Sequence, residues 1–465
     1  MRPVALLGSI ALLLANLTGW TAEHSHHPHP EGPRPALAAP PSRYVPLPRE
    51  DTLITGATLL DGAGGRLENA DVSIHEGRIL AAGHHLPREG LKVIDAAGRW
   101  LTPGLIDVHT HDGTYLLPQT AEESAASDVA EESDPNAADT WIEHAVRPGD
   151  PAFSRALAGG VTTLQILPGS APLIGGRSVI VKPVPAVTLE QMRFPDAPQG
   201  LKMACGSNPA ATFGGHGRAP NSRQGEIALL RTALLDAQRY AAAWEEYRSG
   251  REDEPPKRDL KLDTLLAARR GEVRVHLHCY RADEIANWLT VLGEFGVRVA
   301  AVHHATEAYK IAPLLAQQQV CAAVWPDWWG FKREAEDGIA ENAAFLDAAG
   351  ACVMLHSDIP LLGSLLNLEA ARAAAAGRRA GLVIPPERAI RWITSNPAGA
   401  LGLGSRVGRI APGFDADLVL WSGDPFSVYS HTDLVFIDGA LAYDRRIGMR
   451  RSDVELGRPQ QEPVP

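Results

Sequence analysis

Two histidines separated by a single residue, His109 and His111, end an apolar run that begins at Leu101. If this run is a β-strand, side chains two positions apart share a face, so both imidazoles point the same way. Two neutral imidazole nitrogens at the end of a buried strand can bind one divalent cation. The alternative is a histidine pair on a solvated surface. The interpretation therefore depends on whether further ligands follow at the ends of later strands.

A parallel β/α pattern between residues 101 and 403 supplies such strand ends. Apolar runs alternate there with helix-like stretches, for example residues 225–247, whose apolar side chains recur at helical spacing. The candidate strands are 105–108, 161–167, 179–181, 201–205, 273–278, 299–302, 320–324 and 352–355. Eight strands with intervening helices predict a closed (β/α)8 TIM barrel, in which functional residues lie at the carboxyl ends of the strands.

Histidines, a lysine and a carboxylate recur at these predicted strand ends. For any one of them, core packing or a local hydrogen bond is an adequate explanation, but their recurrence favours a common metal site. The residues are His109, His111, Lys202, His276, His278, His303, His304 and Asp358.

Short β-like runs separated by Gly-rich turns flank this segment at 51–100 and again at 404–447. We expect the two sets to pair into one small β-sandwich lobe, with the barrel (101–403) inserted between them. Residues 1–22 resemble a secretory signal peptide, because Arg2 precedes a short apolar stretch and small residues follow it. A His/Pro-rich linker (23–50) and a polar tail (448–465) complete the predicted organisation. Residues 245–259 are charged and proline-interrupted, which indicates a surface excursion.

The net charge of −11 argues against nucleic acid or an anionic membrane surface as a partner. The apolar stretch near the N-terminus is short for a spanning helix, so stable membrane insertion is not expected. The sequence instead predicts an exported protein of the periplasm or the medium. The four cysteines are too few and scattered for a disulfide framework, so we expect buried free thiols, with a Cys205–Cys279 disulfide as the less favoured alternative.

Several motifs together resemble the amidohydrolase superfamily. They are Pro103-Gly-Leu-Ile-Asp-Val-His-Thr-His111, Gly160-Val-Thr-Thr163, His276, His304-Ala-Thr-Glu307 and His356-Ser-Asp358. Others resemble its imidazolonepropionase-related branch, namely Pro168-Gly-Ser170, Gly175-Gly176, Leu201-Lys-Met-Ala204, Asn396-Pro-Ala-Gly-Ala-Leu-Gly402 and Val407-Gly-Arg-Ile-Ala-Pro-Gly-Phe-Asp-Ala-Asp417. The resemblance covers residues 52–446 and is specific for the superfamily, whereas it says little about the substrate.

The resemblance implies a metal-dependent hydrolase on a distorted (β/α)8 barrel, with one or two divalent metal ions, most simply Zn²⁺. By position, His109, His111 and Asp358 would bind the more buried metal. His276 and His304 would bind a second metal or, with one metal only, orient substrate and water. His278 shares a strand face with His276 and stays open as the alternative ligand.

A bridging ligand between two metals is the point where this chain departs from the family pattern. The branch often reads Gly-Glu-Asn-Pro after the fourth strand, whereas this chain reads Gly206-Ser-Asn-Pro209. Ser207 cannot bridge two cations as a carboxylate does. Either a carboxylated Lys202 bridges two metals or the site holds one, and Lys182 is a more distant option.

The implied reaction is hydrolysis of an amide, a cyclic amide or a dipeptide by water whose pKa a divalent metal lowers from ~15.7 to about 7. Asp358 would accept the water proton and pass it to the leaving nitrogen. His276, His278, His303 or His304 would assist at the substrate carbonyl. Arg223 or Arg218 could bind a substrate carboxylate and Trp325, with its neighbours Trp328 and Trp329, could form a pocket wall, although solvation and core packing are the simpler explanations.

Three alternatives to amide hydrolysis remain open from the sequence. The same site could serve a deaminase or a lactone or ester hydrolase, and Ser207 keeps a non-catalytic metal-binding or ligand-binding barrel under consideration. The expected partner is a small-molecule substrate. The sequence does not determine whether the chain forms a homo-oligomer.

Overall fold

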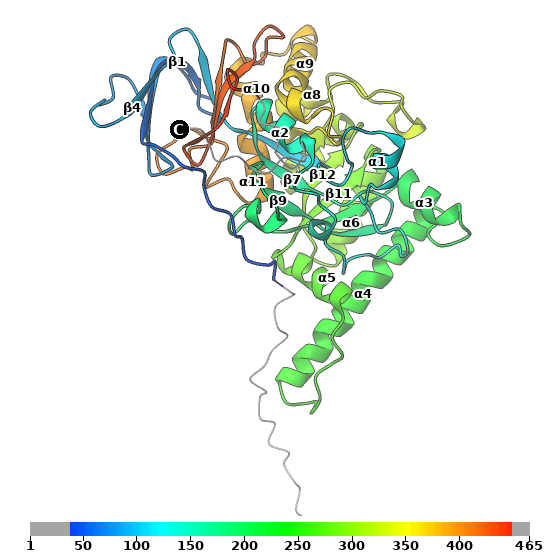
Figure 1. The fold of residues 1–465 in the computed structure, drawn as a ribbon. Helices are drawn as coiled ribbons and strands as arrows, with labels where there is room; N and C mark the ends of the chain where they lie inside the picture. The colour runs from blue at the N-terminus through cyan, green and yellow to red at the C-terminus, as the bar shows by residue number, and fades with distance from the viewer. Residues whose placement is uncertain (1–37, 449–465) are drawn as a thin grey trace, which may run out of the picture.

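The structure, a computed structural model, describes residues 38–448 of the 465-residue chain. The predicted signal peptide, the first part of the predicted linker and nearly all of the predicted tail lie outside these residues. Figure 1 shows a β-rich lobe, in which strands from the N-terminal and C-terminal parts of the described chain meet, beside a larger α/β part. Among the described helices, none combines the length and the apolar composition needed to cross a membrane.

The lobe is a single hydrogen-bonded sheet of eight strands taken from both ends of the described chain. β1 pairs antiparallel with β2 on one side, and on the other side it pairs in parallel with β4 and then with β5. β5 continues the sheet into the C-terminal strands through β15. The strands are β1 (Thr52–Leu60), β2 (Arg66–His75), β3 (Arg78–Gly83), β4 (Lys92–Asp95), β5 (Trp100–Pro103), β15 (Leu418–Trp421), β16 (Thr432–Ile437) and β17 (Ala440–Asp444). A two-sheet sandwich is therefore not confirmed, because one sheet that branches at β1 joins the two segments.

Parallel strands with side chains buried on both faces form the wall of the larger part. Their near-continuous apolar runs are typical of sheets covered by helices. β10 to β14 pair in parallel in chain order, and β6 pairs in parallel with β7. The strands are β6 (Leu105–Thr110), β7 (Val161–Ile166), β10 (Gly200–Ala204), β11 (Arg274–Cys279), β12 (Val299–His304), β13 (Cys321–Val324) and β14 (Val353–Leu355).

The predicted third barrel strand, residues 179–181, runs against its neighbours. It is β9 (Val179–Val181), antiparallel to β7, and the preceding β8 (Ile174–Arg177) is antiparallel to β10. The connection from β7, residues 167–173, is too short for the crossover that a parallel strand needs. The prediction of eight parallel strands is therefore wrong here, and the β8–β9 segment links the β6–β7 pair to the other five strands.

The wall is TIM-barrel-like, but it is not a closed hydrogen-bonded barrel, since no ladder joins β14 to β6 in the described chain. Two other contacts hold this seam. The Asp358 N–H donates to the His109 carbonyl at 2.9 Å, and the Ser357 N–H donates to the Asp107 carboxylate at 3.2 Å. The strands that carry His109 and Asp358 consequently lie side by side.

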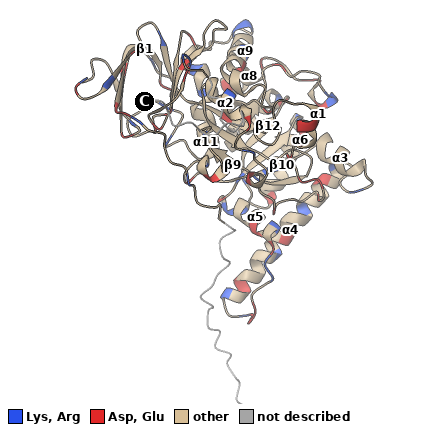
Figure 2. Ribbon diagram, in the orientation of Figure 1, with Lys and Arg blue, Asp and Glu red and all other residues tan. Residues whose placement is uncertain are grey.

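Helices cover the outside of the wall. α4 is the longest, and its first turn is capped by Ser222, whose Oγ accepts the Gly225 N–H. This confirms the predicted helix at 225–247. Figure 1 shows α4 extending away from the wall, and Figure 2 shows charges of both signs along it. Residues 245–259, at and after the end of α4, are mostly exposed, as expected for a surface excursion. The helices are α1 (Ala121–Ala125), α2 (Pro151–Ala158), α3 (Ser207–Gly214), α4 (Arg223–Arg248), α5 (Leu260–Arg270), α6 (Ala282–Glu294), α7 (Ala312–Gln318), α8 (Asn342–Ala348), α9 (Leu366–Arg379), α10 (Pro386–Ala389) and α11 (Ser395–Leu401).

Lys182 ties the barrel wall to the lobe. Its buried Nζ lies 2.8 Å from an Asp438 carboxylate oxygen and 3.3 Å from Asp417, and the Tyr44 hydroxyl donates to Asp438 at 2.6 Å. A buried lysine is tolerated because two carboxylates offset its charge. This ion network occupies the Lys182 ammonium and gives it a structural role away from the histidines at the strand ends.

Candidate metal centre

His109 and His111 lie at the end of β6 with their Nε2 atoms facing Asp358. His109 Nε2 is 3.3 Å and His111 Nε2 is 3.6 Å from Asp358 Oδ1. The Leu167 carbonyl lies 2.8 Å from His111 Nδ1, which places the ring proton on Nδ1 and leaves Nε2 as an acceptor. Two imidazole nitrogens and a carboxylate oxygen therefore converge on one point, a ligand set that suits a divalent metal ion.

His304 and Asp358, at this rim, have backbone conformations that only a minority of non-glycine residues adopt. Asp358 has a φ of 64° and His304 a φ of 68°. Such left-handed conformations cost free energy and cluster at functional sites. At His304 the turn rotates a strand-end side chain back toward the interior, where it meets the other histidines.

The side chain of Lys202, on β10, reaches the same group of residues as His109, His111 and Asp358. Its fully buried Nζ donates to the Pro168 carbonyl at 2.8 Å and lies 3.5 Å from His109 Nε2. Burial lowers the pKa of Lys202, although the Asp358 carboxylate opposes this effect. Burial likewise raises the pKa of Asp358. A lysine in this place can be held as a neutral amine, which is the nucleophilic form of the side chain.

A second group of buried histidines has nitrogens with no hydrogen-bond partner in the described part of the chain. These are Nε2 of His278, Nδ1 of His304 and both ring nitrogens of His356. The His278 and His304 rings are 4.3 Å apart between centroids, and those of His304 and His356 are 5.0 Å apart. Burial lowers the pKa of all three, so the rings are neutral and offer lone pairs.

These orphaned nitrogens test whether a metal fits. Buried polar atoms without partners are rare, and each needs an explanation such as an ion. His109, His304, His356 and Asp358 each offer a ligand atom, and all four atoms lie within 4.8 Å of one another. The donor set of imidazole and carboxylate groups matches Zn²⁺ and similar cations, so the residues present fit the metal that the sequence implied.

The two histidines of β11 occupy different depths. Both nitrogens of His276 face protein groups, with Nδ1 2.9 Å from His303 Nε2 and Nε2 3.2 Å from the Gln165 amide. His278 lies nearer the rim, and its Nδ1 is 2.7 Å from Ser170 Oγ, which leaves Nε2 free. The geometry thus favours His278 over His276 as the metal-facing residue, opposite to the preference drawn from the motif.

His303 also faces protein groups instead of the orphaned nitrogens. Its Nδ1 lies 3.1 Å from His109 Nδ1, on the far side of that ring from Asp358. Of the adjacent pair His303 and His304, the latter therefore reaches the cluster.

An aromatic wall borders the cluster beyond β13. The buried Trp325 ring stacks on His304 with 4.3 Å between centroids, and Trp328 stacks on Trp325 at 4.5 Å. Tyr280 also stacks on His304, with 5.3 Å between centroids. Trp329, in contrast, is 69% exposed and its indole N–H donates to the Glu336 carbonyl. The predicted pocket wall thus contains Trp325 and Trp328, together with Tyr280, but not Trp329.

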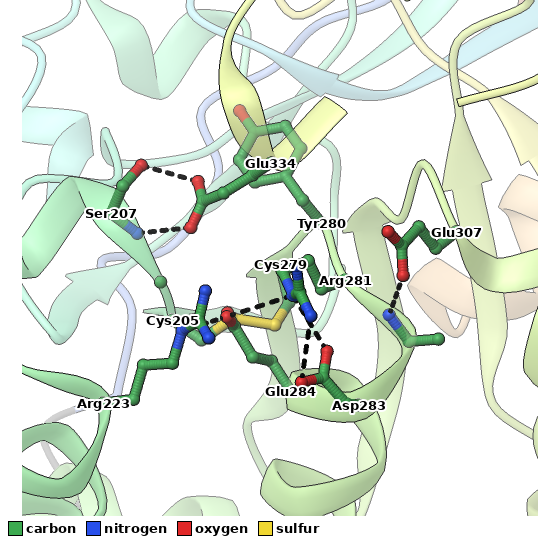
Figure 3. Close-up of polar contacts among 12 residues, drawn as sticks. Cys205, Ser207, Arg223, Cys279, Tyr280, Arg281, Asp283, Glu284, Glu307 and Glu334 are labelled. Carbon is green, nitrogen blue, oxygen red and sulfur yellow. Dashed lines mark hydrogen bonds and ion pairs between the residues drawn. A yellow bond between two sulfur atoms is a disulfide. The ribbon is translucent and has the colours of Figure 1, made fainter. Parts of the chain in front are cut away.

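The polar rim beside α3 is occupied by ion pairs (Figure 3). Ser207 donates both its backbone N–H and its hydroxyl to Glu334, at 2.7 and 2.5 Å. Arg223 pairs with Glu284. Elsewhere, Arg218 donates to the Ser133 carbonyl. The two arginines proposed for a substrate carboxylate therefore have partners already, and Ser207 takes no place among the metal donors.

Both cysteine pairs are disulfides, which corrects the prediction of free thiols. Cys205–Cys279 joins the ends of β10 and β11, with 5.2 Å between Cα atoms, and Cys321–Cys352 joins β13 to the residue before β14, with 4.5 Å. The physical reason is tertiary, because adjacent parallel strands bring residues far apart in sequence within bridging distance. From the sequence, only Cys205–Cys279 was expected as a possible disulfide.

The sequence did not single out His356, Tyr280, Gln165 or Ser170 as site residues, although His356 stands in the motif His356-Ser-Asp358. A signal existed for His356, since it precedes Asp358 by two positions and such residues share a strand face. Tyr280 directly follows β11, and Ser170 was noted only as part of a family motif. Gln165 carried no signal, because a glutamine in a buried strand is ordinarily read as packing.

Comparison with known proteins places this geometry in a family. The model of the Amidohydrolase family matches residues 260–444. The crystal structure of an amidohydrolase from Thermotoga maritima is 32% identical, covers 85% of this chain and 100% of that chain, and superposes with a TM-score of 0.78. The chain belongs to the amidohydrolase family.

Two curated relatives extend this result. Amidohydrolase tasK of Hapsidospora irregularis is 30% identical over 410 residues, which are 82% of this chain and 41% of tasK, so the chain spans about two fifths of that relative. An imidazolonepropionase of Stenotrophomonas maltophilia is 25% identical over 444 residues, 87% of this chain and 98% of that protein. The resemblance of this amidohydrolase to the imidazolonepropionase-related branch is thus confirmed.

Proposed function

We propose that the protein is an exported, metal-dependent amidohydrolase that hydrolyses a carbon–nitrogen bond in a small substrate, either an amide, a cyclic amide or a dipeptide. One observation carries the proposal. The ligand atoms of His109, His304, His356 and Asp358 gather within 4.8 Å at the carboxyl ends of the strands, and active sites of barrel enzymes lie at this face.

The proposed ligands fall into two groups. His109, His111 and Asp358 would hold one cation, and His278 and His304 would hold a second if a carboxylated Lys202 joins them. When bound, a divalent metal would polarise the substrate carbonyl and make water acidic enough to attack near neutral pH. His356 is an additional donor to either position.

Asp358 is the proposed proton shuttle. Its carboxylate lies among the proposed ligands and its side chain is 19% exposed, so it can reach both water and substrate. It would accept a proton from the attacking water and return it to the nitrogen of the leaving amine, which must be protonated before it departs. Neutral histidines around it cannot supply that proton, because burial holds their pKa values far below neutrality.

The aromatic wall supports a substrate with a flat or apolar part next to the scissile bond. Trp325 is buried, and its indole nitrogen has no partner within the described residues, so it can donate one hydrogen bond to a bound molecule. Lys332 stands 3.8 Å from the Tyr280 ring centroid at the same rim. Lys332 is paired with Glu334 at 3.0 Å, as Arg223 is with Glu284, so a substrate carboxylate would have to compete with a protein carboxylate at either cation.

Export is proposed from the chain itself. The N-terminal 22 residues have the composition of a signal peptide. Two disulfides between barrel strands support location in an oxidising compartment such as the periplasm, because the cytosol keeps cysteine thiols reduced.

A substrate panel with zinc-loaded protein tests the proposed activity. N-acyl amino acids, dipeptides, cyclic amides, aminopurines, lactones and esters are each incubated with enzyme, and release of acid, amine and ammonia is measured. Acid together with amine supports amide hydrolysis, whereas ammonia alone indicates a deaminase and lactone opening alone indicates an ester hydrolase. Zinc binding without turnover of any compound would favour a binding protein instead.

A further inference from the structure

A row of buried polar side chains continues inward from His109, on the side away from Asp358. His109 Nδ1 lies 3.1 Å from His303 Nδ1, and His303 Nε2 lies 2.9 Å from His276 Nδ1. His276 Nε2 then lies 3.2 Å from the Gln165 amide, which is 2.9 Å from Ser178 Oγ. All five side chains are at most 1% exposed.

A neutral imidazole has one N–H donor and one acceptor nitrogen. Three neutral rings in a row can therefore be hydrogen-bonded in only two directions. When every N–H points inward, His109 donates from Nδ1 and its Nε2 keeps a lone pair toward Asp358. When every N–H points outward, the proton of His109 sits on Nε2 and blocks that nitrogen as a ligand.

The group at the inner end decides between these directions. If the Gln165 oxygen faces His276, it accepts the His276 Nε2–H and the row runs inward. If the amide nitrogen faces His276, the row runs outward. The two orientations differ by a 180° rotation of the amide.

The surroundings of Gln165 favour the oxygen. With the nitrogen toward His276, Oε1 has no partner among the described residues. Ser178 Oγ already accepts the Gly200 N–H at 2.9 Å, so its own hydrogen needs an acceptor. Oε1 turned toward His276 and Ser178 receives both N–H and O–H, which satisfies the oxygen and the hydroxyl together.

Gly200 gives this inner end the space that it needs. A Cβ at position 200 would lie 2.5 Å from Ser178 Oγ, 2.8 Å from Gln165 Nε2 and 2.8 Å from His276 Cδ2. The backbone of β10 thus approaches the row closely on the side of Gln165, and a side chain at position 200 would displace its inner end.

We propose that Gln165, His276 and His303 are positioning residues that hold His109 in the Nδ1–H tautomer and so present its Nε2 to the metal. This relay rests on the proposed function, because it presumes that His109 is a metal ligand. It assigns to His276 and His303 a role that differs from ligation and from contact with substrate. Mutation of a residue that is hydrogen-bonded to a metal ligand commonly weakens metal affinity by 10- to 100-fold.

The experiment compares Gln165→Met and His276→Asn with the parent protein, each purified without metal and titrated with Zn²⁺ against a chromophoric chelator. Both variants are expected to bind Zn²⁺ 10- to 100-fold more weakly with unchanged stoichiometry. Thr163→Val is the matched control, since Thr163 is equally buried in β7 and its hydroxyl makes no hydrogen bond within the described residues. Its affinity should stay within twofold of the parent.

A second measurement reads the tautomer without metal or activity. With ¹⁵N-labelled histidine, the ring nitrogens of His109 in the metal-free parent should report a proton on Nδ1, and Gln165→Met should populate the Nε2–H form. A parent protein with the proton of His109 on Nε2 overturns the relay, as does an affinity for Zn²⁺ that stays within twofold in both variants.

Other outcomes are equally decisive. Loss of one whole equivalent of Zn²⁺ in His276→Asn would make His276 a ligand and overturn the relay while leaving the metal centre in place. Failure of the parent to bind Zn²⁺ at all would overturn the proposed function and, with it, the role of the relay. If His276→Asn does not fold, Gln165→Met alone decides, because it removes no ring from the core.

Discussion

His109 and Asp358 stand at the first and last strands of the barrel wall, and they meet through both backbone and side chain. The Asp358 N–H donates to the His109 carbonyl at 2.9 Å, while its Oδ1 lies 3.3 Å from His109 Nε2. The contact that holds the open seam of the wall is thus also the contact that assembles the proposed metal ligands. Damage to the seam is expected to damage the site.

Replacement of Asp358 by asparagine separates these two roles. Asp358→Asn keeps the backbone contact and an oxygen ligand, but it removes the group that accepts the water proton. We expect C–N bond hydrolysis to fall by roughly 10²- to 10⁴-fold, measured as initial rates with zinc-loaded protein. Thermal unfolding should stay close to the parent. Unchanged hydrolysis would show that another residue moves the proton.

Lys202 decides how many metal ions the centre holds. If it is carboxylated and bridges two cations, the parent contains two equivalents of metal per chain, and Lys202→Ala contains one. Metal analysis by mass spectrometry after dialysis measures this directly. Lys182→Met is the control, because Lys182 is equally buried but pairs with Asp417 and Asp438. One equivalent in both the parent and Lys202→Ala would refute the bridge.

His278 and His276 should respond differently to the same replacement. His278→Asn removes a nitrogen that faces the cluster, so we expect the loss of one metal equivalent and of most hydrolysis. His276→Asn should keep the metal count and weaken affinity, since both of its nitrogens face other side chains. If His276→Asn instead loses a metal equivalent and His278→Asn does not, His276 is the metal ligand on β11.

The disulfide Cys205–Cys279 should stabilise the protein. Replacing both cysteines by serine opens a loop with a sequence separation of 74, and such losses typically lower the free energy of unfolding by about 2 to 5 kcal/mol. The Cys321–Cys352 pair closes a separation of only 31, and its removal should cost about 0.8 kcal/mol less on loop entropy alone. Urea unfolding of the two double variants measures the difference, and four free thiols in the denatured parent would contradict both disulfides.

Glu226 should make stability depend on pH. Burial, with Glu284 and Glu334 nearby, raises its pKa from 4.5 to about 8. The folded protein then binds this proton more tightly than the unfolded chain, so its contribution to stability is largest below about pH 4.5 and falls as the pH rises to about 8. In Glu226→Gln the fall should be smaller, whereas the exposed control Glu246→Gln should behave like the parent. Unfolding free energies measured between pH 5 and 9 test this, and identical pH profiles for Glu226→Gln and the parent would contradict it.

The strand ends that carry the site were accessible from the sequence because they obey short-range rules. Residues two apart on a strand share a face, which predicts that His109 and His111 act together. Apolar runs alternating with helices predict a parallel wall whose carboxyl ends meet. The sequence therefore predicts that Asp358 and the later histidines belong to one candidate site.

The depth at which each side chain lies along the wall could not be predicted from these short-range rules. His276 and His278 share a face of β11, but they differ by about 6.6 Å along the strand. Whether the upper or the lower ring meets the cluster depends on the stagger between neighbouring strands. Adjacent residues on a strand, such as His303 and His304, should point to opposite faces. The left-handed conformation of His304 turns its side chain so that both rings lie inside the wall.

The sequence by itself determined which donors this amidohydrolase has, the family to which it belongs and the shared strand face of donors two residues apart, because these follow from residue type and period. The tertiary structure alone decided that β9 runs antiparallel, that four cysteines pair across neighbouring strands, and that His278, His304 and His356 have free nitrogens where His276 and His303 do not. Those outcomes depend on contacts between residues far apart along the chain. Their distances are set by packing, which no local pattern records.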